Sequence, residues 1–462
     1  MSKACCILEL QPLEDPTRSQ HQHDTTTITR RSCNEISYND FYWNHMLTNF
    51  PVVLTGISNS WHCRQHWTLG GCDAVQGGAP YSALKRIHNT AINYDYLKHK
   101  LGNWQVPVAN CSLEYFNSHA KSEMSFHDFL DYWQLKSQKE INRNAVATKE
   151  TLRNRNSNFA EPTAETENLY LKDWHLKAQM PEYDFYRVPK YFASDWLNEY
   201  LTENGKDDYQ FVYMGPKESW TSFHADVFGS YSWSTNIVGC KRWVLLPPGE
   251  ENHLKDQFGN MPLRINEQLL KERLVRHFII KQTENESLFV PSGWYHQVHN
   301  VTDTISVNHN WFNACNLQQI WQNLASNMRQ VIAEIEDCRQ MDNFDEHCHT
   351  MLRASFGLNF YDFLDMLEYI AKKRLRFCNN NNDQSLERVD DTQNTETSSR
   401  EILGDSRGDL IFNSYILNDY HIEYDLHCIN ALVHIMLEND VINANQSLHR
   451  RCLSLKELTN KF

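Results

Sequence analysis

A histidine and an aspartate two positions apart are the first candidates for chemistry in this chain. Residues 219–232 read SWTSFHADVFGSYS, so His224 and Asp226 form the pattern His-x-acid. With 22 His and 58 acidic residues in 462, about three such pairs are expected by chance, and two are present, the other being His421 with Glu423. The pair therefore indicates a metal site only when a third ligand and a suitable secondary structure accompany it.

Secondary structure separates the two pairs. Alternate side chains of a strand point to one face, so an extended TSFHADV segment places His224 and Asp226 side by side. On the helix expected around His421, positions two apart lie about 200° from each other and cannot share a metal. The segment VPSGWYHQVHN offers His296 as a third ligand near a strand start, whereas His299 has the opposite parity. Two His and one carboxylate are typical of non-haem Fe(II) oxygenases; a polar residue at a barrel rim is the alternative for His296.

A lysine among aromatic residues indicates a place for an anion. In SYSWSTNIVGCKRWVLLPP, taken as one continuous strand, Lys241 shares a face with Trp233 and Trp243. Because a buried unpaired ammonium costs several kcal/mol, Lys241 is expected to meet either a dicarboxylate cosubstrate or an internal Asp or Glu. Thr221, three positions before His224, can offer its hydroxyl to the same carboxylate.

The segment TISVNHNW has a polar face. Ser306, Asn308 and Asn310 share this face, while His309 lies on the other one. Three hydrogen-bonding residues on one side of a strand indicate either a polar cavity or a side that faces solvent.

Short aromatic and β-branched segments between 168 and 312 must hold these groups in place. Gly, Pro and Asn separate the segments, the pattern of closely spaced strands in a barrel or sandwich. A further short strand is expected at 51–56. Helices are expected over 41–50 after a capping box of Ser37 and Asp40, from Ser125 onward, from 317 to 335, over about 360–377 and within 410–438.

Composition narrows the class of protein. The net charge is −14 at pH 7, so direct binding of nucleic acid is not expected, and an acidic protein suits a basic partner. Thirteen cysteines without a C-x-x-C pair indicate neither a zinc module nor a disulfide scaffold. No apolar run reaches about 18 residues, and the first residues lack a signal-peptide layout, so we expect no membrane span and a cytoplasmic location.

Four motifs together resemble one known family. WTSFHAD, Lys241 seventeen residues after His224, VPSGWYHQVHN and SVNHNW are similar to those of the JmjC family of Fe(II)- and 2-oxoglutarate-dependent oxygenases. They resemble its hydroxylase (cupin-like) branch, of the lysyl hydroxylase type, more than its chromatin branch. The resemblance covers about residues 36–330. It implies a mostly β core with flanking helices, namely a double-stranded β-helix (cupin or jelly roll), followed by C-terminal helices.

The resemblance implies an iron centre and its cosubstrates. His224, Asp226 and His296 match the catalytic Fe(2+) ligands, and 2-oxoglutarate and O2 are the implied cosubstrates. No fourth protein ligand is evident, so positions remain open for cosubstrate and O2.

The resemblance also implies a cosubstrate pocket. Lys241 and Thr221 match residues that bind the distal carboxylate of 2-oxoglutarate. Asn308, twelve residues after His296, and Tyr170 in LYLKDW match further polar residues of that pocket. Ser234 stands where some relatives have Asn.

The resemblance and the composition together divide the chain. The segments are a disordered tail at 1–35, an oxygenase domain at 36–330 with its metal and cosubstrate core at 168–312 and a polar surface insertion at 137–167, a helical extension at 331–377, a low-complexity linker at 378–409 and a C-terminal helical segment at 410–462.

The implied activity is hydroxylation of a lysine carbon in a protein, with the eukaryotic translation release factor as the implied substrate. Demethylation of N-methyl-lysine by the same chemistry is one alternative. A catalytically inactive cupin that binds a partner is another. The oligomeric state is left open by the sequence.

Overall fold

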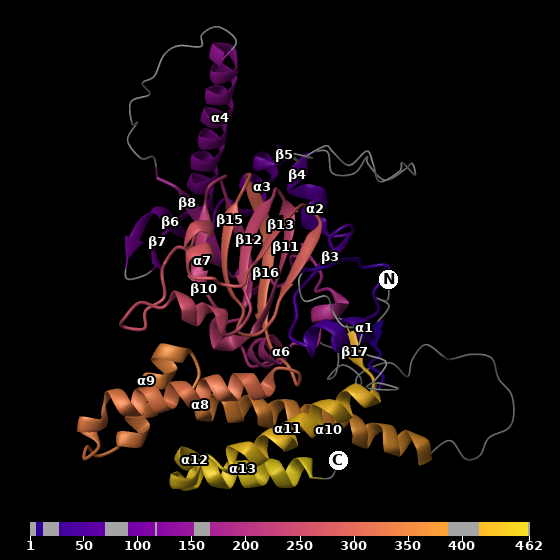
Figure 1. The fold of residues 1–462 in the computed structure, drawn as a ribbon. Coiled ribbons are helices and arrows are strands. Elements are labelled where there is room, and N and C mark those ends of the chain that lie inside the picture. Colours follow the sequence, from indigo (N-terminus) through magenta and orange to yellow (C-terminus); the bar gives the residue numbers. More distant parts are fainter. Residues whose placement is uncertain are drawn as a thin grey trace, which may run out of the picture.

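The computed structural model describes residues 6–12, 27–69, 91–115, 118–151, 167–386 and 415–460. Two β-sheets form its centre, and a layer of helices from the C-terminal half lies across one end of them (Figure 1). This is the mostly β, cupin-like core with flanking and C-terminal helices that the sequence predicts. In the described part of the chain the hydrogen-bonded ladders remain two sheets and do not close into a barrel.

The larger of the two sheets has nine strands in the described part of the chain. In spatial order its nine strands are β2 (Arg30–Ser32), β3 (Val52–Thr55), β14 (Glu286–Val290), β11 (Tyr231–Val238), β16 (Thr304–Trp311), β9 (Gln210–Gly215), β8 (Leu169–Trp174), β6 (Gln105–Tyr115) and β7 (Ser118–Ser125). Their central members are rich in the aromatic and β-branched residues that favour strands. β11 pairs antiparallel with both β14 and β16 and so links the halves of the sheet.

The smaller sheet carries most of the candidate ligands. Its strands are β10 (Trp220–His224), β15 (Tyr295–Asn300), β12 (Lys241–Leu246) and β13 (Phe278–Gln282). The chain passes from the large sheet to the small one between β11 and β12, at Gly239, whose φ is +81°. A Cβ there would lie 1.9 Å from the carbonyl oxygen of Asp303, so the turn requires glycine. Shorter pairs are formed by β1 (Cys6–Leu8) with β17 (Tyr415–Leu417) and by β4 (Thr68–Leu69) with β5 (Ala91–Ile92).

Helices surround the sheets and form the C-terminal layer. The helices that precede β16 in the chain are α1 (Tyr38–Phe41), η1 (Tyr42–Met46), α2 (His62–His66), α3 (Tyr94–Leu101), α4 (Phe126–Thr151), α5 (Leu176–Gln179), η3 (Lys190–Phe192), α6 (Trp196–Glu203), η4 (Val227–Gly229), η5 (Glu250–Leu254) and α7 (Glu267–Glu272). Those after it are α8 (Leu317–Glu334), η6 (Glu336–Cys338), α9 (Phe344–Phe356), α10 (Phe360–Leu386), α11 (Asp419–Met436), α12 (Asp440–Ala444) and α13 (Gln446–Thr459). No helix among the described residues combines the length and the apolar character needed to span a bilayer.

Local signals in the sequence set several helix ends. The predicted capping box is present, because Ser37 Oγ accepts from the Asp40 N–H and the Asp40 carboxylate accepts from the Ser37 N–H. Asn359 Oδ1 accepts from the first N–H groups of α10, as predicted. The apolar face predicted from 317 onward is buried in α8.

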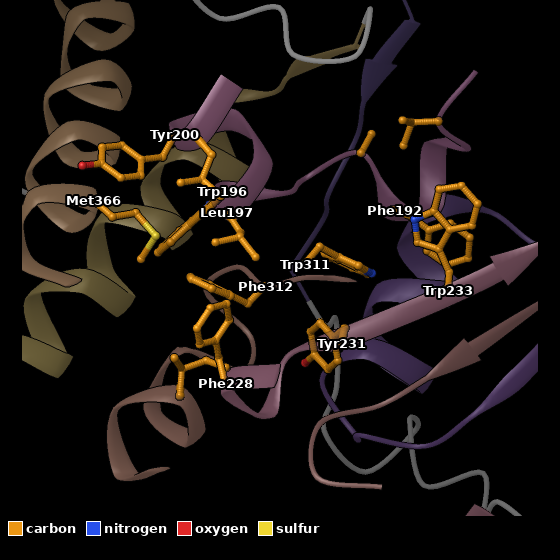
Figure 2. Packing of buried hydrophobic residues seen from close by; sticks show 14 of the residues in the cluster. Phe192, Trp196, Leu197, Tyr200, Phe228, Tyr231, Trp233, Trp311, Phe312 and Met366 are labelled. Carbon is orange, nitrogen blue, oxygen red and sulfur yellow. The ribbon is translucent and has the colours of Figure 1, made fainter. Parts of the chain in front are cut away.

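One hydrophobic core joins the sheets to the helical layer. Figure 2 shows Trp196, Leu197 and Tyr200 of α6 beside Met366 of α10, with Phe228, Phe312 and Trp311 next to them and Trp233 farther along the sheet; all ten labelled residues are buried. The described C-terminal helices therefore pack on the β-sheet core of the same chain.

The structure differs from the sequence prediction in three places. Two parts of the expected disordered tail at 1–35 are folded: Leu8 and Leu10 are buried, and β2 pairs with β3. α4 continues to Thr151 and projects from the sheets (Figure 1), so the first half of the polar insertion at 137–167 is helical. α10 runs to Leu386, into the segment expected to be a low-complexity linker. A polar composition is compatible with an exposed helix. The polar composition of these two segments therefore did not predict how far α4 and α10 extend. The remainder of 378–409 lies outside the described residues.

Candidate metal centre and cosubstrate pocket

The two sheets bring His224, Asp226 and His296 together. One ligand atom from each residue lies within 4.8 Å of those of the other two. His224 ends β10 and is the ladder partner of His296 on β15, so antiparallel pairing alone places the two imidazoles side by side, with ring centroids 4.4 Å apart. Asp226 follows the strand end, yet its backbone is still extended (φ −63°, ψ 150°), which keeps its side chain on the same side.

Hydrogen bonds to the backbone orient both imidazoles. His224 Nδ1 lies 2.8 Å from the carbonyl oxygen of Ser222, and His296 Nδ1 lies 2.9 Å from that of Trp294. A carbonyl oxygen can only accept, so each Nδ1 carries the proton and each Nε2 keeps its lone pair. Metal-binding histidines are commonly held in this way. Burial, followed by the neighbouring His296, lowers the pKa of His224 to about 4, so this imidazole is neutral at pH 7.

Asp226 is oriented by a hydroxyl from the opposite sheet. Ser232 Oγ on β11 donates to Asp226 Oδ2 at 2.7 Å, which leaves Oδ1 for another partner. Two imidazole nitrogens and one carboxylate oxygen of this kind fit Fe(II), which takes such ligands on one face and leaves positions open for cosubstrate and O2.

A cavity of about 760 Å³ opens from this cluster. Its walls come from both sheets, from α6 and the segment that follows it, and from the corner between α9 and α10. At that corner a Cβ on Gly357 would lie 2.9 Å from the ring of Phe228, two residues after Asp226. The corner between α9 and α10 therefore completes the wall of the cavity that contains His224, Asp226 and His296.

Lys241 lies at the inner end of the cavity and spans the two sheets. From β12 its Nζ donates to Ser306 Oγ on β16 at 2.6 Å and to Ser234 Oγ on β11 at 3.4 Å. The rings of Trp243 and Tyr213 lie at 5.9 Å from the same nitrogen. The side chain is 2% exposed.

The assignment of Lys241 and Trp233 to one strand face is wrong. The turn at Gly239 divides the segment into β11 and β12, which belong to different sheets. The alternation of side-chain direction in β11 therefore does not continue into β12. Trp233 packs in the hydrophobic core, whereas Ser234, of opposite parity, faces Lys241. Trp243, which follows the turn, does lie near the lysine, as predicted.

Lys241 has hydroxyls and aromatic rings for neighbours. Among the described residues no carboxylate lies within 4 Å of its ammonium, so the internal ion pair considered as an alternative is not formed there. Burial, with a smaller contribution from Lys172, lowers the pKa of Lys241 to about 7. A cation in this position gains stability when an anion enters the cavity.

The other predicted pocket residues line the same cavity. Thr221 reaches it because the ladder between β10 and β15 shifts between Thr221 and His224. Asn308 Nδ2 donates to Ser306 Oγ at 3.0 Å, beside Lys241. Tyr170 packs so tightly on Gly215 that a Cβ there would meet its ring at 2.5 Å.

His299 and His309 lie apart from the cluster, as parity predicts. His299 stacks on Trp220, with ring centroids 5.6 Å apart. His309 Nε2 is 2.7 Å from the hydroxyl of Tyr186 in the core. His421 is buried on α11 and contacts Tyr38, so the second His-x-acid pair is helical, as expected.

Three residues at or beside the cavity were missed as individual candidates. Ser306 was noted only as part of a polar face. Tyr213, on β9, lies against Lys241, and Lys172 follows Tyr170 by two positions on β8. Strand parity in LYLKDW and QFVYMG could have identified Lys172 and Tyr213, whereas no local signal points to Gly357.

Comparison with known proteins defines the class. Residues 211–311 match the family model described as "JmjC domain, hydroxylase", and this span contains the three clustered residues and Lys241. The protein is thus a JmjC oxygenase.

Relatives define the family more closely. The Drosophila melanogaster "2-oxoglutarate and iron-dependent oxygenase JMJD4 homolog" is 50% identical over 426 residues, covering 92% of this chain and 91% of that protein. The Danio rerio "2-oxoglutarate and iron-dependent oxygenase JMJD4" is 36% identical over 436 residues, covering 92% and 90%. An Arabidopsis thaliana protein, "Arginine-specific demethylase JMJ20", is 34% identical over 358 residues, covering 73% and 68%. The chain belongs to the JMJD4 family of 2-oxoglutarate and iron-dependent oxygenases.

Proposed function

We propose that this chain hydroxylates a carbon of a lysine side chain in a protein, and that the protein is a translation release factor. The observation that carries the oxygenase chemistry is one cavity that holds both the His224–Asp226–His296 cluster and a buried lysine without a carboxylate partner among the described residues. The three clustered side chains would bind iron, and Lys241 would bind an anionic cosubstrate.

Each part of the site has a role in this proposal. Nε2 of His224, Nε2 of His296 and Oδ1 of Asp226 would hold Fe(II), because their other polar atoms are engaged. Lys241 and Thr221 would bind the distal carboxylate of 2-oxoglutarate, in the place where Ser234, Ser306 and Asn308 already form a polar cradle. Iron with 2-oxoglutarate and O2 supplies an oxidant that can remove hydrogen from an unactivated C–H bond, which acid–base side chains cannot do.

A lysine substrate is supported by charge and by the motifs. The net charge is −14, which suits a basic partner. The exposed Asp207 lies in the cavity wall after α6, where an entering ammonium would find its carboxylate and the ring of Tyr209. The motifs resemble the lysyl hydroxylase type, whose members act on a lysine of the translation release factor.

Demethylation is the second candidate. It is favoured by the Arabidopsis relative, which is named as an arginine-specific demethylase. The same iron chemistry on an N-methyl group would release formaldehyde and leave the unmodified side chain.

Mass spectrometry of the product decides between the two. The purified protein with Fe(II), 2-oxoglutarate and ascorbate is incubated with a lysine peptide of the release factor and with its methylated form. Hydroxylation adds one oxygen to the unmodified peptide, and demethylation removes a methyl group from the other. Succinate release that does not respond to either peptide, under conditions where 2-oxoglutarate binds, would contradict both.

Matched variants test the metal site itself. Asp226→Ala and His296→Ala each remove one of three ligands, so both should abolish turnover and Fe(II) binding. His299→Ala, on the same strand as His296, should retain most of both, because its ring stacks on Trp220 instead. Equal loss in His299→Ala and His296→Ala would refute the assignment.

A further inference from the structure

A second lysine lines the cavity without an assigned role. Lys172 lies on β8, two positions after Tyr170, so both side chains face the cavity. Its Nζ lies 6.0 Å from the ring of Tyr170. The residue is half-buried and lines the cavity, which makes its ammonium a candidate for ligand binding.

The backbone around Lys172 is irregular in a way that directs its side chain. The ladder between β8 and β9 shifts between Leu171 and Trp174, and Asp173 has a φ of +58°. Tyr213 donates to Asp173 Oδ1 at 2.6 Å, and Lys121 donates to Oδ2 at 3.0 Å. These bonds fix the irregular residue, and such bulges commonly re-aim a side chain beside an active site.

The cations of the cavity wall divide into two groups. Lys121 pairs with Asp173, Arg353 is held in a two-pronged pair by Asp362, and the exposed Lys206 donates to the hydroxyl of Tyr200. Lys241 is buried and Lys172 is half-buried, and neither has a carboxylate within 4 Å among the described residues. Two such cations lining one cavity match a ligand with two negative charges.

We propose that Lys172 is a second anion-binding residue of this cavity and pairs with the carboxylate of 2-oxoglutarate next to the keto group, while Lys241 pairs with the distal carboxylate. The inference rests on the proposed function, since it takes 2-oxoglutarate as the dicarboxylate. The hydroxyl cradle at Lys241 holds one end of the ligand, and the half-buried Lys172 is the cation of the cavity that remains for the other end.

The charges of the two lysines support this arrangement. Burial lowers the pKa of Lys172, with Asp173 opposing and Lys121 adding to the effect. Lys172 in turn contributes, after burial, to the lowered pKa of Lys241. Lys172 thus disfavours the charged form of Lys241, and a dianion close to both ammonium groups offsets that effect.

Two ligands separate the two lysines experimentally. 2-Oxoglutarate carries both carboxylates, whereas 2-oxopentanoate keeps the keto acid and lacks the distal carboxylate. Binding of each to the Mn²⁺-loaded protein is measured by calorimetry without O2. Lys172→Ala should weaken both ligands by about ten- to a hundredfold, whereas Lys241→Ala should weaken 2-oxoglutarate and leave 2-oxopentanoate unchanged.

The controls keep the result interpretable. Lys206→Ala, at the rim, should change neither affinity, and Lys172→Met keeps the aliphatic stem, so its thermal melt and Mn²⁺ affinity should match wild type. Wild-type affinity of Lys172→Ala for both keto acids would overturn the inference and leave the proposed function intact. A Lys172→Ala effect confined to the KM of the protein substrate would also overturn it. Failure of the wild-type protein to bind 2-oxoglutarate would instead overturn the proposed function.

Discussion

Two buried cations in this protein have opposite surroundings. Arg374, on α10, donates to both carboxylate oxygens of Glu199 at 2.9 and 3.0 Å and to Asp425 at 2.9 Å. Lys241, in the sheet cavity, donates to hydroxyls. Their exposures are almost the same, 1% for the arginine and 2% for the lysine. Burial of a charge therefore does not distinguish a structural ion pair from a binding site, and the neighbours of the charge do.

The pKa values follow the same division. Burial alone would lower the pKa of Arg374, but Glu199 and Asp425 outweigh it and raise the pKa. At Lys241 burial is not opposed by a carboxylate, and the pKa falls to about 7. Arg374 is neutralised by two carboxylates of the protein, whereas the ammonium of Lys241 remains available to an anionic ligand.

The largest expected effect on stability is at the arginine. Arg374→Met should lower the free energy of unfolding by about 3–5 kcal/mol, because Glu199 and Asp425 stay buried without their shared partner. Denaturant unfolding of the apo protein measures this loss. Arg353→Met is the control, since its pair with Asp362 is 56% exposed on the arginine side and should contribute about 0–1 kcal/mol. Equal losses in both variants would break the comparison.

The lysine should show the reverse pattern. Lys241→Met should reduce the affinity for 2-oxoglutarate by about thirty- to several-thousandfold, the equivalent of roughly 2–5 kcal/mol. The apo protein should be as stable as wild type or more so, because an enclosed cation has been removed. Thermal melts with and without 2-oxoglutarate and Mn²⁺ measure both effects. If the variant loses apo stability yet is stabilised by 2-oxoglutarate as much as wild type, Lys241 has a structural role like that of Arg374 and does not bind the cosubstrate.

A pH titration sharpens the difference. The pKa of Lys241 is lower in the folded protein than the value of about 10.4 usual for lysine, so between about pH 7 and 10 the unfolded chain binds the extra proton and apo stability should rise with pH. Binding of a dicarboxylate requires the ammonium, so the affinity should fall above pH 7, by up to about tenfold per unit, with proton uptake. Calorimetry in buffers of different ionisation heat detects that uptake.

The same titration has a built-in control. The titratable residues beside Lys241 are Lys172 on β8 and Tyr213 on β9, whose ring lies 5.9 Å from the Lys241 ammonium nitrogen. Lys241→Met should lose most of the proton uptake and keep the part that belongs to Lys172. Uptake identical to wild type would assign the proton to another group.

The smallest effect concerns a neutral partner. Thr221→Val keeps the shape of the side chain and removes its hydroxyl, so the affinity for 2-oxoglutarate should fall by about three- to tenfold, the equivalent of one hydrogen bond. Apo stability should change little, because Thr221 faces the cavity. Ser222→Ala, at the next position of β10, keeps the backbone carbonyl that orients His224, so the affinity should fall less than in Thr221→Val.

Much of the centre could be predicted from the sequence because local rules reach it. Strand parity was enough to group His224 with Asp226, to choose His296 over His299, and to identify the polar face that contains Asn308. Parity failed at Gly239, because a turn that sends the chain into the other sheet resets the alternation. A strand pattern does not reveal such a turn unless the glycine is read as a boundary.

Features made by distant segments could not be predicted. The α9–α10 corner that lies against Phe228 is more than a hundred residues away from it, and neither sequence indicates the contact. Arg374 likewise meets Glu199, 175 positions earlier. Composition also misjudged the N-terminal segment, where the buried Leu8 and Leu10 lie within a polar tail.

The pairing of β1 with β17 joins segments from near the two ends of the described chain, so it can form only late in synthesis. Asn418 Nδ2 donates to the carbonyl oxygen of Leu10, 408 positions earlier, beside the ladder that joins Cys6–Leu8 to Tyr415–Leu417. This closure can form only when most of the chain has left the ribosome. A product cut short before that point keeps an open strand edge and two uncovered leucines, features that promote aggregation and recruit chaperones. Products that lack Tyr415–Leu417 are therefore expected to aggregate although they contain His224, Asp226 and His296.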